Sequence, residues 1–466
     1  MKYYEEQPKK LPVHEYDVVV AGAGTGGVVA AIAAARNGAK TIVIESKGYP
    51  GGIIVEGGTA LHSFFNVWKP YSGVEKRQLV KGLPQEIIER LIKVGGCSGH
   101  AEMMSAFDYD CINTSIDTEL YKVVAFEMMM EAGVTCMMNS LVVEAIVENG
   151  IIQGVIIENR EGRQAIMAKS FIDATGHGDL CAFAGAEFTE LCDYASANSI
   201  GMGGVNVDQY HQFLLAHNAA NHEAYGLRSG EPDKLVRVSA SEDGSHVMDS
   251  KNDKRLPKEF LESAKKIGMA LVTTTVHDDF FMFIKLNYHI KAPSTDMAAV
   301  NLAELELRKR QVQAVELFRK YVPGCEKAFI ARTSPSLSYR RGRTIVCDYD
   351  MKPDEIVEGT HYEDDIFTYG FHDLAPQVHI KEGRSYGLPY RALLVKGLEN
   401  LYATGMMITT DFEAHMSTRN TVSCMGMGQA AGTAAAMCAK KECTSRELPY
   451  SLLRQSLLND QVFLED

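Results

Sequence analysis

Three glycines and one carboxylate near the start of the chain have the spacing of a nucleotide site. The segment GAGTGG places Gly22, Gly24 and Gly27 in a G-x-G-x-x-G pattern. Gly22 permits a tight turn, Gly24 lets a pyrophosphate approach the backbone, and Gly27 lets a helix pack closely on a strand. Glu45 follows, and its carboxylate can accept hydrogen bonds from ribose hydroxyls and would repel a 2′-phosphate. These residues indicate binding of a dinucleotide.

A second set of residues, near the end of the chain, could handle protons and anions. His415 and Arg419 stand four positions apart in the segment TTDFEAHMSTR. A histidine can act as a general acid or base near neutral pH, and an arginine can grip a carboxylate with two hydrogen bonds. An ordinary hydrogen-bonded histidine is an equally acceptable interpretation of His415.

The segments around the three glycines form the strand–helix–strand unit that a dinucleotide site requires. Residues 17–21 (DVVVA) are an unbroken apolar run and predict a buried parallel strand. An alanine-rich helix is expected over about 26–37, closed by Gly38, and a second strand over 41–44 ends at Glu45. Because all the parts are in order, a glycine-rich turn without a nucleotide is the less favoured interpretation.

Two later segments favour FAD over NAD. In FIDATGHGDL an apolar strand ends in a second glycine turn, which a plain NAD domain does not need. The segment NLYATG leads on to a helix of very small residues, expected over about 425–439. The N-terminus of such a helix, placed at the flavin pyrimidine, would stabilise negative charge on the reduced ring. Taken alone, that helix could equally be a close-packed core helix.

The order of these motifs resembles a known family. GAGTGG, FIDATGHGDL, NLYATG and RNTVSCMGMGQAAGTAAA follow one another as in FAD-dependent oxidoreductases with a glutathione-reductase-type FAD-binding fold. The nearest match is the bacterial branch with an "IDATGDGDLA" strand and an "MGQAAGTAAA" helix. The resemblance covers roughly the first 190 and the last 135 residues, and SYRRGRTIVCDYDMKPDEI is similar to that branch's arginine-rich stretch. His177 stands where the family usually has an acid.

The resemblance implies a set of FAD contacts. The glycine pair after Glu45 would bring backbone N–H groups to the pyrophosphate, and Val143 would place backbone against adenine. The contacts implied in this way are Gly22, Gly24, Gly27, Glu45, Gly51, Gly52, Val143, Ala174, Gly176, Asp179, Gly405, Gly428 and Gln429.

For the chemistry, the candidates are His415, Arg419, His372 and Arg341. Flavin N5 carries the hydride, and the protein must orient the substrate and supply or accept a proton. The basic cluster at Arg340, Arg341 and Arg343 could contact an anionic substrate or the flavin, or could be a solvated loop. Further residues that could face the site are His379, His62, for which a covalent flavin link is conceivable, and Cys424, which has no partner cysteine nearby for a disulfide-reductase function.

The fold class that follows is α/β, with a discontinuous Rossmann-like FAD-binding domain of glutathione-reductase type and an inserted α+β substrate or cap domain. We assign residues 1–60, 117–200 and 386–466 to the FAD-binding domain. Residues 61–116 and 201–385 are assigned to the substrate or cap domain.

Other segments carry structural expectations. A helix is expected over 117–132, and strands over 141–147 and 151–158 form a hairpin about Asn149-Gly150. A strand over 165–172 should lead into the second glycine turn, and residues 226–257, dense in charge, should form a surface excursion. A long helix over 297–321 has apolar residues at Leu305, Val312, Val315, Phe318 and Val322.

Composition narrows the function classes. The chain has 466 residues and a formal net charge of −13, which argues against a basic nucleic-acid-binding face. It contains no apolar run long enough to span a membrane and no signal-peptide core in its first ten residues, so a cytoplasmic location is expected. The ten cysteines include no CxxC pair, so no metal site is predicted.

The function expected from these observations is hydride transfer between FAD and a small soluble molecule, possibly anionic or bearing a carbonyl or hydroxyl group. Two alternatives stay open: a non-redox lyase, isomerase or nucleotide-binding module on the same fold, and a flavin-dependent electron-transfer subunit. The residues leave open the substrate, the direction of reaction, the second electron carrier and the oligomeric state.

Overall fold

A parallel sheet of five strands forms the centre of the nucleotide-binding half of the molecule. The computed structural model describes residues 3–4, 6–58, 60–104, 110–240, 256–375 and 377–465. The sheet has the order β23-β11-β2-β3-β7, and every neighbouring pair is parallel. Four of these strands are completely buried, as their apolar sequences predict. The strands are β2 (Val18–Ala21), β3 (Thr41–Ile44), β7 (Thr135–Met137), β11 (Ser170–Asp173) and β23 (Leu401–Ala403).

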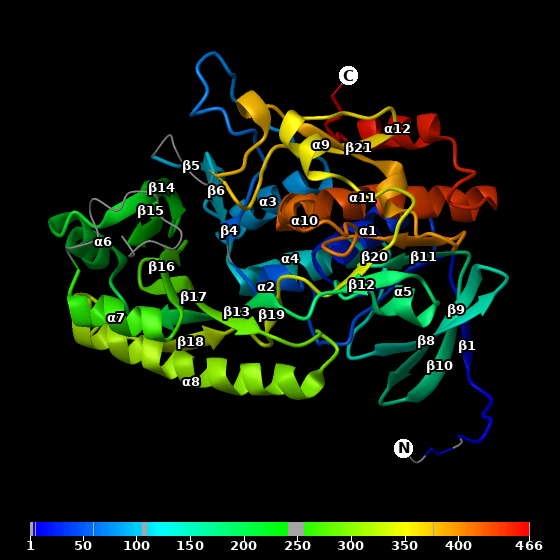
Figure 1. The fold of residues 1–466 in the computed structure, drawn as a ribbon, viewed down its shortest axis with the longest axis horizontal. Helices are drawn as coiled ribbons and strands as arrows, with labels where there is room; N and C mark the ends of the chain where they lie inside the picture. The colour runs from blue at the N-terminus through cyan, green and yellow to red at the C-terminus, as the bar shows by residue number, and fades with distance from the viewer. Residues whose placement is uncertain are drawn as a thin grey trace.

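The helices that cover this sheet pack unusually closely. Helix α1 (Thr25–Arg36) lies beside α11 (Thr421–Lys441) in the middle of Figure 1. A Cβ atom at Gly428 would overlap the carbonyl oxygen of Gly26, and one at Gly432 would overlap that of Ala30. The predicted glycine-rich strand–helix–strand unit and the small-residue helix are confirmed, although α11 begins earlier than expected, after Asn420 as its N-cap.

A four-stranded sheet with the order β1-β10-β9-β8 flanks the parallel sheet. The predicted hairpin is confirmed, with positive φ at Asn149 (51°) and Gly150 (77°), as a tight two-residue turn requires. The expected single strand over 165–172 is wrong, because the chain changes sheets there. Ala168 N–H bonds to β9 and Ser170 N–H bonds to Asp17, so β10 ends and β11 begins. The strands are β1 (Val13–Glu15), β8 (Leu141–Glu148), β9 (Ile151–Asn159) and β10 (Gly162–Met167).

The other half of the molecule is built on a large antiparallel sheet, seen on the left of Figure 1 with helices α6, α7 and α8. Its order is β14-β15-β16-β17-β13-β18, and β19 also pairs with β13. Its strands are β13 (Tyr194–Gly203), β14 (Ala220–Arg228), β15 (Glu231–Ala240), β16 (Met269–Thr274), β17 (Phe280–Ile290), β18 (Phe329–Thr333) and β19 (Ser338–Tyr339), and its helices are α6 (Val207–Ala216), α7 (Lys258–Lys266) and α8 (Met297–Tyr321).

Two expectations for this half need correction. Residues 226–240 do not form a surface excursion, because β14 and β15 pair within the sheet and bury Val236 and Val238; the rest of that expectation, 241–255, lies outside the described residues. The long helix is confirmed as Met297–Tyr321, but Leu305 and Val312 are exposed. Val315, Phe318 and Val322 are buried as predicted, and the buried face also uses Ala303 and Gln311.

Buried apolar residues form two main clusters, one around the parallel sheet and one around the large antiparallel sheet. The first also includes residues from β21 (Asp365–Tyr369) and β22 (Tyr386–Pro389). The predicted domain boundaries stay a prediction. No helix of the described residues is both long and apolar enough to cross a membrane. The remaining elements are β4 (Ala60–Leu61), β5 (Ala101–Glu102), β6 (Ile112–Ser115), β12 (Phe188–Glu190), β20 (Arg343–Ile345), α2 (Ile53–Glu56), α3 (Leu83–Lys93), α4 (Thr118–Glu131), α5 (Asp179–Phe183), α9 (Pro353–Glu358), α10 (Phe412–Thr418) and α12 (Tyr450–Asn459).

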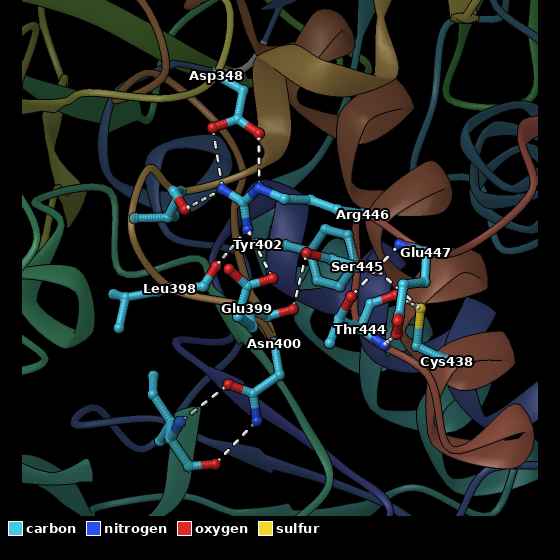
Figure 2. Close-up of polar contacts among 12 residues, drawn as sticks. Asp348, Leu398, Glu399, Asn400, Tyr402, Cys438, Thr444, Ser445, Arg446 and Glu447 are labelled. Carbon is cyan, nitrogen blue, oxygen red and sulfur yellow. Dashed lines mark hydrogen bonds and ion pairs between the residues drawn. The ribbon is translucent and has the colours of Figure 1, made fainter. Parts of the chain in front are cut away.

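A polar network that includes the loop after α11 fixes β23, the strand that precedes Gly405. In Figure 2, Arg446 lies against Asp348, with two hydrogen bonds of 2.9 Å, and also donates to backbone oxygens of 395 and 398. The Asn400 side chain accepts from Ile152 N–H and donates to the oxygens of Ile152 and Lys169. Because these bonds satisfy loop backbone groups that burial would otherwise leave unpaired, they hold β23 in place at the edge of the parallel sheet.

We expect Gly432→Ala to lower the free energy of unfolding. The added Cβ would meet the Ala30 backbone, which cannot move without shifting α1, and overpacking of this kind typically costs about 1–3 kcal/mol. Urea unfolding followed by circular dichroism measures the change, with Lys441→Ala at the exposed end of the same helix as the control. Equal stability of the two variants would show that α1 and α11 do not pack this closely in solution.

Candidate active site

A large cavity lies between the parallel sheet and the large antiparallel sheet. Its volume is about 2090 Å³, larger than the roughly 300–1,000 Å³ of common small-molecule sites. One wall is made by the glycine loop and the ends of β11 and β23, and the opposite wall by residues such as Ser239, Val272 and Phe283. The size therefore allows a dinucleotide and a second molecule together.

The glycine loop forms a cradle that a side chain would fill. Gly22 has φ of 92°, and a Cβ there would lie 2.7 Å from the oxygen of Ala174. Gly24 caps α1 without a side-chain hydrogen bond, and the first turn of the helix has no acidic residue. The N–H groups of that turn and the positive end of the helix dipole thus face the cavity as a site for phosphate.

Glu45 ties the end of β3 to this loop. Its side chain is 8% exposed, and its Oε2 accepts the N–H of Ala23 at 2.8 Å. Its Oε1 accepts from Lys47 N–H at 2.9 Å and from the Ser46 hydroxyl at 3.0 Å. A carboxylate offers about four acceptor positions, so capacity remains for a ribose hydroxyl in the cavity that Glu45 lines.

The second glycine turn is organised by an acid that the sequence analysis missed. Asp173, fully buried, accepts hydrogen bonds from the Thr175 hydroxyl at 2.7 Å and from Cys181 N–H at 2.8 Å. Burial raises the pKa of Asp173. Asp179 pairs with Arg343 at 2.7 Å. The only sequence signal for Asp173 was its place at the end of an apolar strand.

Most of the FAD contacts implied by the resemblance lie on the cavity wall. They are Gly22, Gly24, Glu45, Gly52, Ala174, Gly176, Asp179 and Gly405.

The remaining implied contacts lie behind the wall, where each has a packing function. Gly27 packs on the Gly22 carbonyl, Gly51 donates to the Ala23 oxygen at 2.8 Å, and Gly428 packs on Gly26. The Gln429 carboxamide accepts Leu83 N–H at 2.9 Å. Val143 lies at an irregularity of β8, and the residues that line the cavity there are instead Ser140, Leu141 and Val142.

His415 lies on the cavity wall but is held as a neutral donor. It is 1% exposed, and its Nε2 donates to the backbone oxygen of Arg340 at 3.0 Å. Burial, and secondarily the charge of Arg341, lower the pKa of His415 to about 3. At neutral pH this ring is therefore uncharged, and its Nε2–H group donates to the protein backbone.

Arg419, the C-cap of α10, also lines the cavity, and it forms an ion pair with Asp373. Asp373 lies 3.9 Å from Arg340 as well. The acid therefore compensates part of the positive charge that the two arginines bring to this wall.

Arg341 is a buried cation on this wall with unused donors. It is 5% exposed, lines the cavity, donates through Nη2 to the Thr410 oxygen, and lies 5.9 Å from the centre of the Phe412 ring. Within the described part of the chain, its Nε and Nη1 are buried without a hydrogen-bond partner. Burial lowers the pKa of Arg341. Because unsatisfied buried donors are costly, this guanidinium calls for a ligand with acceptor oxygens.

Other candidates are placed differently. His372 does not line the cavity. Its Nε2 donates to the Glu413 backbone oxygen, and its Nδ1 accepts the N–H of Leu374. Burial lowers the pKa of His372 to about 4. His379 contacts the Tyr71 ring edge-on, away from the cavity wall. Cys424 lines the cavity, and burial raises the pKa of its thiol to about 12.

Two further groups on the wall were not recognised from the sequence as site residues. Glu56, 5% exposed, pairs with Lys47 and accepts the Tyr49 hydroxyl at 3.0 Å. His177 lies edge-on to the Tyr339 ring, with 4.7 Å between centroids, and burial lowers its pKa. The family's usual acid at that position is thus replaced by a neutral ring.

Comparison with known proteins identifies the family. Residues 17–457 match the model of the family described as FAD dependent oxidoreductase, so the match extends over nearly the whole chain. The chain belongs to this family. It is an oxidoreductase that uses FAD, and its mixed α/β fold is an FAD-binding fold.

Closer relatives match only short parts of this oxidoreductase. A 3-oxosteroid 1-dehydrogenase from Mycolicibacterium smegmatis is 37% identical over 93 residues, which is 20% of this chain and 15% of that protein. One from Mycobacterium tuberculosis is 39% identical over 75 residues, 16% of this chain and 12% of the relative.

Among solved structures, a geranylgeranyl bacteriochlorophyll reductase-like protein from Thermoplasma acidophilum has a TM-score of 0.48 at 14% identity, covering 97% of this chain and 84% of its own. A flavoprotein/dehydrogenase from Cytophaga hutchinsonii has a TM-score of 0.47 at 12% identity, covering 96% and 83%.

The residues present fit FAD. The side-chain-free cradle at Gly22, Gly24 and Gly52 leaves room for a pyrophosphate beside the free N-terminus of α1. Glu45 has acceptor capacity that would suit the adenosine ribose, and the turns at Gly176 and Gly405 leave the cavity wall beside them free of side chains. These are the residues that would hold the cofactor.

Glu45→Arg should weaken retention of FAD. The substitution removes the acceptor of Ala23 N–H, reverses the charge and adds bulk at the ribose position. The ratio of flavin to protein absorbance after gel filtration measures retention, and acid-released cofactor should be FAD and not FMN. Glu144→Arg on β8, outside the cavity wall, is the matched control. Unchanged occupancy in Glu45→Arg would count against the ribose assignment.

Stability should fall as the pH decreases below about 6.5. His372 and His415 have folded-state pKa values of about 4 and about 3, below the unfolded value of about 6.5, so the unfolded chain binds more protons in this window. Each group then contributes a slope of about 1.4 kcal/mol per pH unit.

Urea unfolding at several values between about pH 5 and 6.5 tests this, before carboxylates titrate. His372→Gln should flatten the slope by about one group's contribution. His14→Gln, at an exposed position of β1, should leave it unchanged. An identical slope in all three proteins would contradict burial of a neutral His372.

Proposed function

We propose that this enzyme has an FAD-binding domain of glutathione-reductase type and exchanges a hydride between bound FAD and a small soluble molecule that carries an anionic group next to a carbonyl or hydroxyl. The pairing of a parallel sheet (β23-β11-β2-β3-β7) with a flanking antiparallel sheet supports the domain type. The single observation that supports the substrate class is Arg341, whose buried guanidinium retains two unpartnered nitrogens on the cavity wall.

Arg341 is suited to bind a carboxylate. Its Nη2 is anchored on the Thr410 backbone, which fixes the guanidinium plane, while Nε and Nη1 keep N–H groups that can donate to the oxygens of an anion. Desolvation makes such a pair stronger than it would be in water. Arg341 would thus orient the substrate by its anionic end.

The neighbouring residues support this orientation. Asp373 holds Arg419 by an ion pair and lies 3.9 Å from Arg340, so Asp373 directs both side chains. His415, neutral and donating to the Arg340 backbone, stiffens the same segment without adding charge. When bound, FAD supplies the hydride acceptor or donor. The protein's contribution is to bind, to orient and to exclude water.

The short match to 3-oxosteroid 1-dehydrogenases suggests a different substrate class. By name those relatives act on 3-oxosteroids, for which a buried guanidinium has no evident use. The match covers only 20% of this chain, so Arg341 is the stronger indication. Steroid ketones nevertheless belong among the compounds tested.

The deciding experiment is anaerobic mixing of the yellow holoenzyme with 2-hydroxy acids, with the methyl esters of the same acids, and with 3-oxosteroids. The photoreduced enzyme is mixed in parallel with 2-oxo and unsaturated acids. Loss or return of the flavin's visible absorbance with acids but not with esters would support the proposal. A response to steroids alone, or to no compound in either direction, would overturn it.

Arg341→Gln should raise the KM for the responsive acid while FAD stays bound. Removing one partner of a buried charge pair costs about 2–5 kcal/mol in binding, or roughly 30-fold and upward. Arg341→Lys should recover part of the loss, and Arg163→Gln on β10, off the cavity wall, is the matched control. An unchanged KM would remove Arg341 from substrate binding, and loss of FAD would assign it to the cofactor.

A further inference from the structure

A histidine–aspartate pair on the cavity wall has the geometry of a proton-transferring group. His62 follows the loop after α2, lines the cavity, and has 18% of its side chain exposed. Its Nδ1 lies 3.1 Å from Oδ2 of Asp110, 48 positions further along the chain. Asp110 is 3% exposed, so the carboxylate reaches the cavity only through the histidine ring.

The aspartate is fixed by its own hydrogen bonds. Its Oδ1 accepts from the Ser63 hydroxyl at 2.6 Å, from Cys111 N–H at 2.8 Å and from Ile112 N–H at 3.3 Å. These three donors saturate one oxygen, and the other oxygen is directed at His62. Because the oxygens of Asp110 act as acceptors, the geometry favours Nδ1 of His62 as the donor to Oδ2, which leaves Nε2 as the ring nitrogen without a bond to Asp110.

The ring and backbone of His62 are also held from a second side. The Tyr369 hydroxyl donates to the His62 backbone oxygen at 3.0 Å. The Phe371 ring lies nearly parallel to the imidazole, at 16° and with 5.8 Å between centroids. Phe371 lies two positions before Asp373, the partner of Arg419. The segment that follows β21 therefore contacts both the ring of His62 and the side chain of Arg419.

Three other histidines on or near the wall are arranged differently. His415 and His372 direct Nε2–H at backbone oxygens, and burial keeps both neutral. His289 has an acidic partner, Asp193, but both side chains are more than half exposed, which places this pair at the outer rim. Among the described residues, His62 and Asp110 thus combine a buried acid with a ring on the cavity wall.

We propose that His62 is the residue that transfers the proton in the reaction, and that Asp110 is its positioning residue; this rests on the proposed function. In the oxidising direction, Nε2 accepts the proton of the substrate hydroxyl as the carbon loses a hydride. The alcohol would lose two electrons and become a carbonyl, bound FAD would supply the acceptor for the hydride, and His62 would become positively charged beside Asp110. The reverse reaction returns the proton to the new hydroxyl.

The first test needs no substrate. In 15N-histidine-labelled holoenzyme, the resonances absent from His62→Gln should report a ring protonated on Nδ1, and Asp110→Asn should change that pattern. Acid precipitation should release the flavin, because a covalent link through Nε2 would leave no base. An Nε2-protonated ring or a yellow pellet would overturn the proposal, whatever the fate of the proposed substrate.

The second test uses the acid found by anaerobic mixing. His62→Gln should slow flavin reduction by about 10²- to 10⁴-fold with FAD still bound, and added imidazole should restore part of the rate of His62→Ala. Asp110→Asn should lower the rate and shift its pH profile while leaving KM unchanged. His289→Gln is the matched control. Full rates in both His62 variants would overturn the proposal, and a loss caused by misfolding would appear as lost flavin and no imidazole rescue.

If the panel bleaches no flavin, the proposed function fails while the tautomer and flavin-release measurements still decide the state of His62. If the panel succeeds and His62→Gln retains full rate, only the present inference fails. The two outcomes are therefore distinguishable in one set of proteins.

Discussion

Close backbone contact between α1 and its neighbours is the constraint on which the rest of the structure depends. At Gly27 a side chain would overlap the carbonyl of Gly22, and at Gly428 and Gly432 it would overlap the backbone of α1. Without these glycines α1 would move away from both the loop and α11. The free N–H groups at its start would then no longer face the cavity, and the phosphate site would be lost. The local cost of glycine in a helix, about 1 kcal/mol, is therefore offset by packing that positions the cofactor.

Most charges in and around the cavity are likewise compensated by a neighbouring group or avoided by burial. Asp373 neutralises much of the charge that Arg419 and Arg340 bring, while His415 and His372 are uncharged because burial disfavours the protonated ring. Arg341 stands out against this background as a buried cation with unused donors. The proposed anionic ligand would satisfy the two nitrogens of Arg341 that have no hydrogen-bond partner among the described residues.

The sequence was sufficient to predict the parts of the fold that depend on local pattern. The glycine loop, the hairpin at Asn149-Gly150 and the helix over 297–321 follow from spacing, turn chemistry and periodicity, and all three are confirmed. The pattern failed where tertiary pairing decides, as at 165–172, where the chain changes sheets, and at 226–240, where charged residues lie on a paired hairpin.

The candidate site could be predicted only in part, for a related reason. Residues that touch the cofactor through the backbone leave a glycine signature, so most of the predicted FAD contacts lie on the wall. Side-chain chemistry leaves no such signature, because its partners come from distant segments. Nothing in the sequence links His62 to Asp110, or tells that Asp373 compensates Arg419 and leaves Arg341 exposed to the cavity.

The overall charge of the enzyme determines the distance at which Arg341 can attract an anion. A chain of formal net charge −13 repels an anion at long range, yet this repulsion is screened beyond about 8 Å at physiological ionic strength. Inside the cavity the dielectric is lower and the nearest cation dominates, so attraction begins only after the ligand has entered. Recognition of this kind discriminates between ligands by their contacts inside the cavity and not by long-range electrostatic attraction. The hydroxyl of a bound substrate would then need a proton acceptor that is itself uncharged before reaction, because a resident negative charge would oppose the carboxylate. His62 is suited to this step, because its acidic partner Asp110 lies behind the ring and not on the cavity wall.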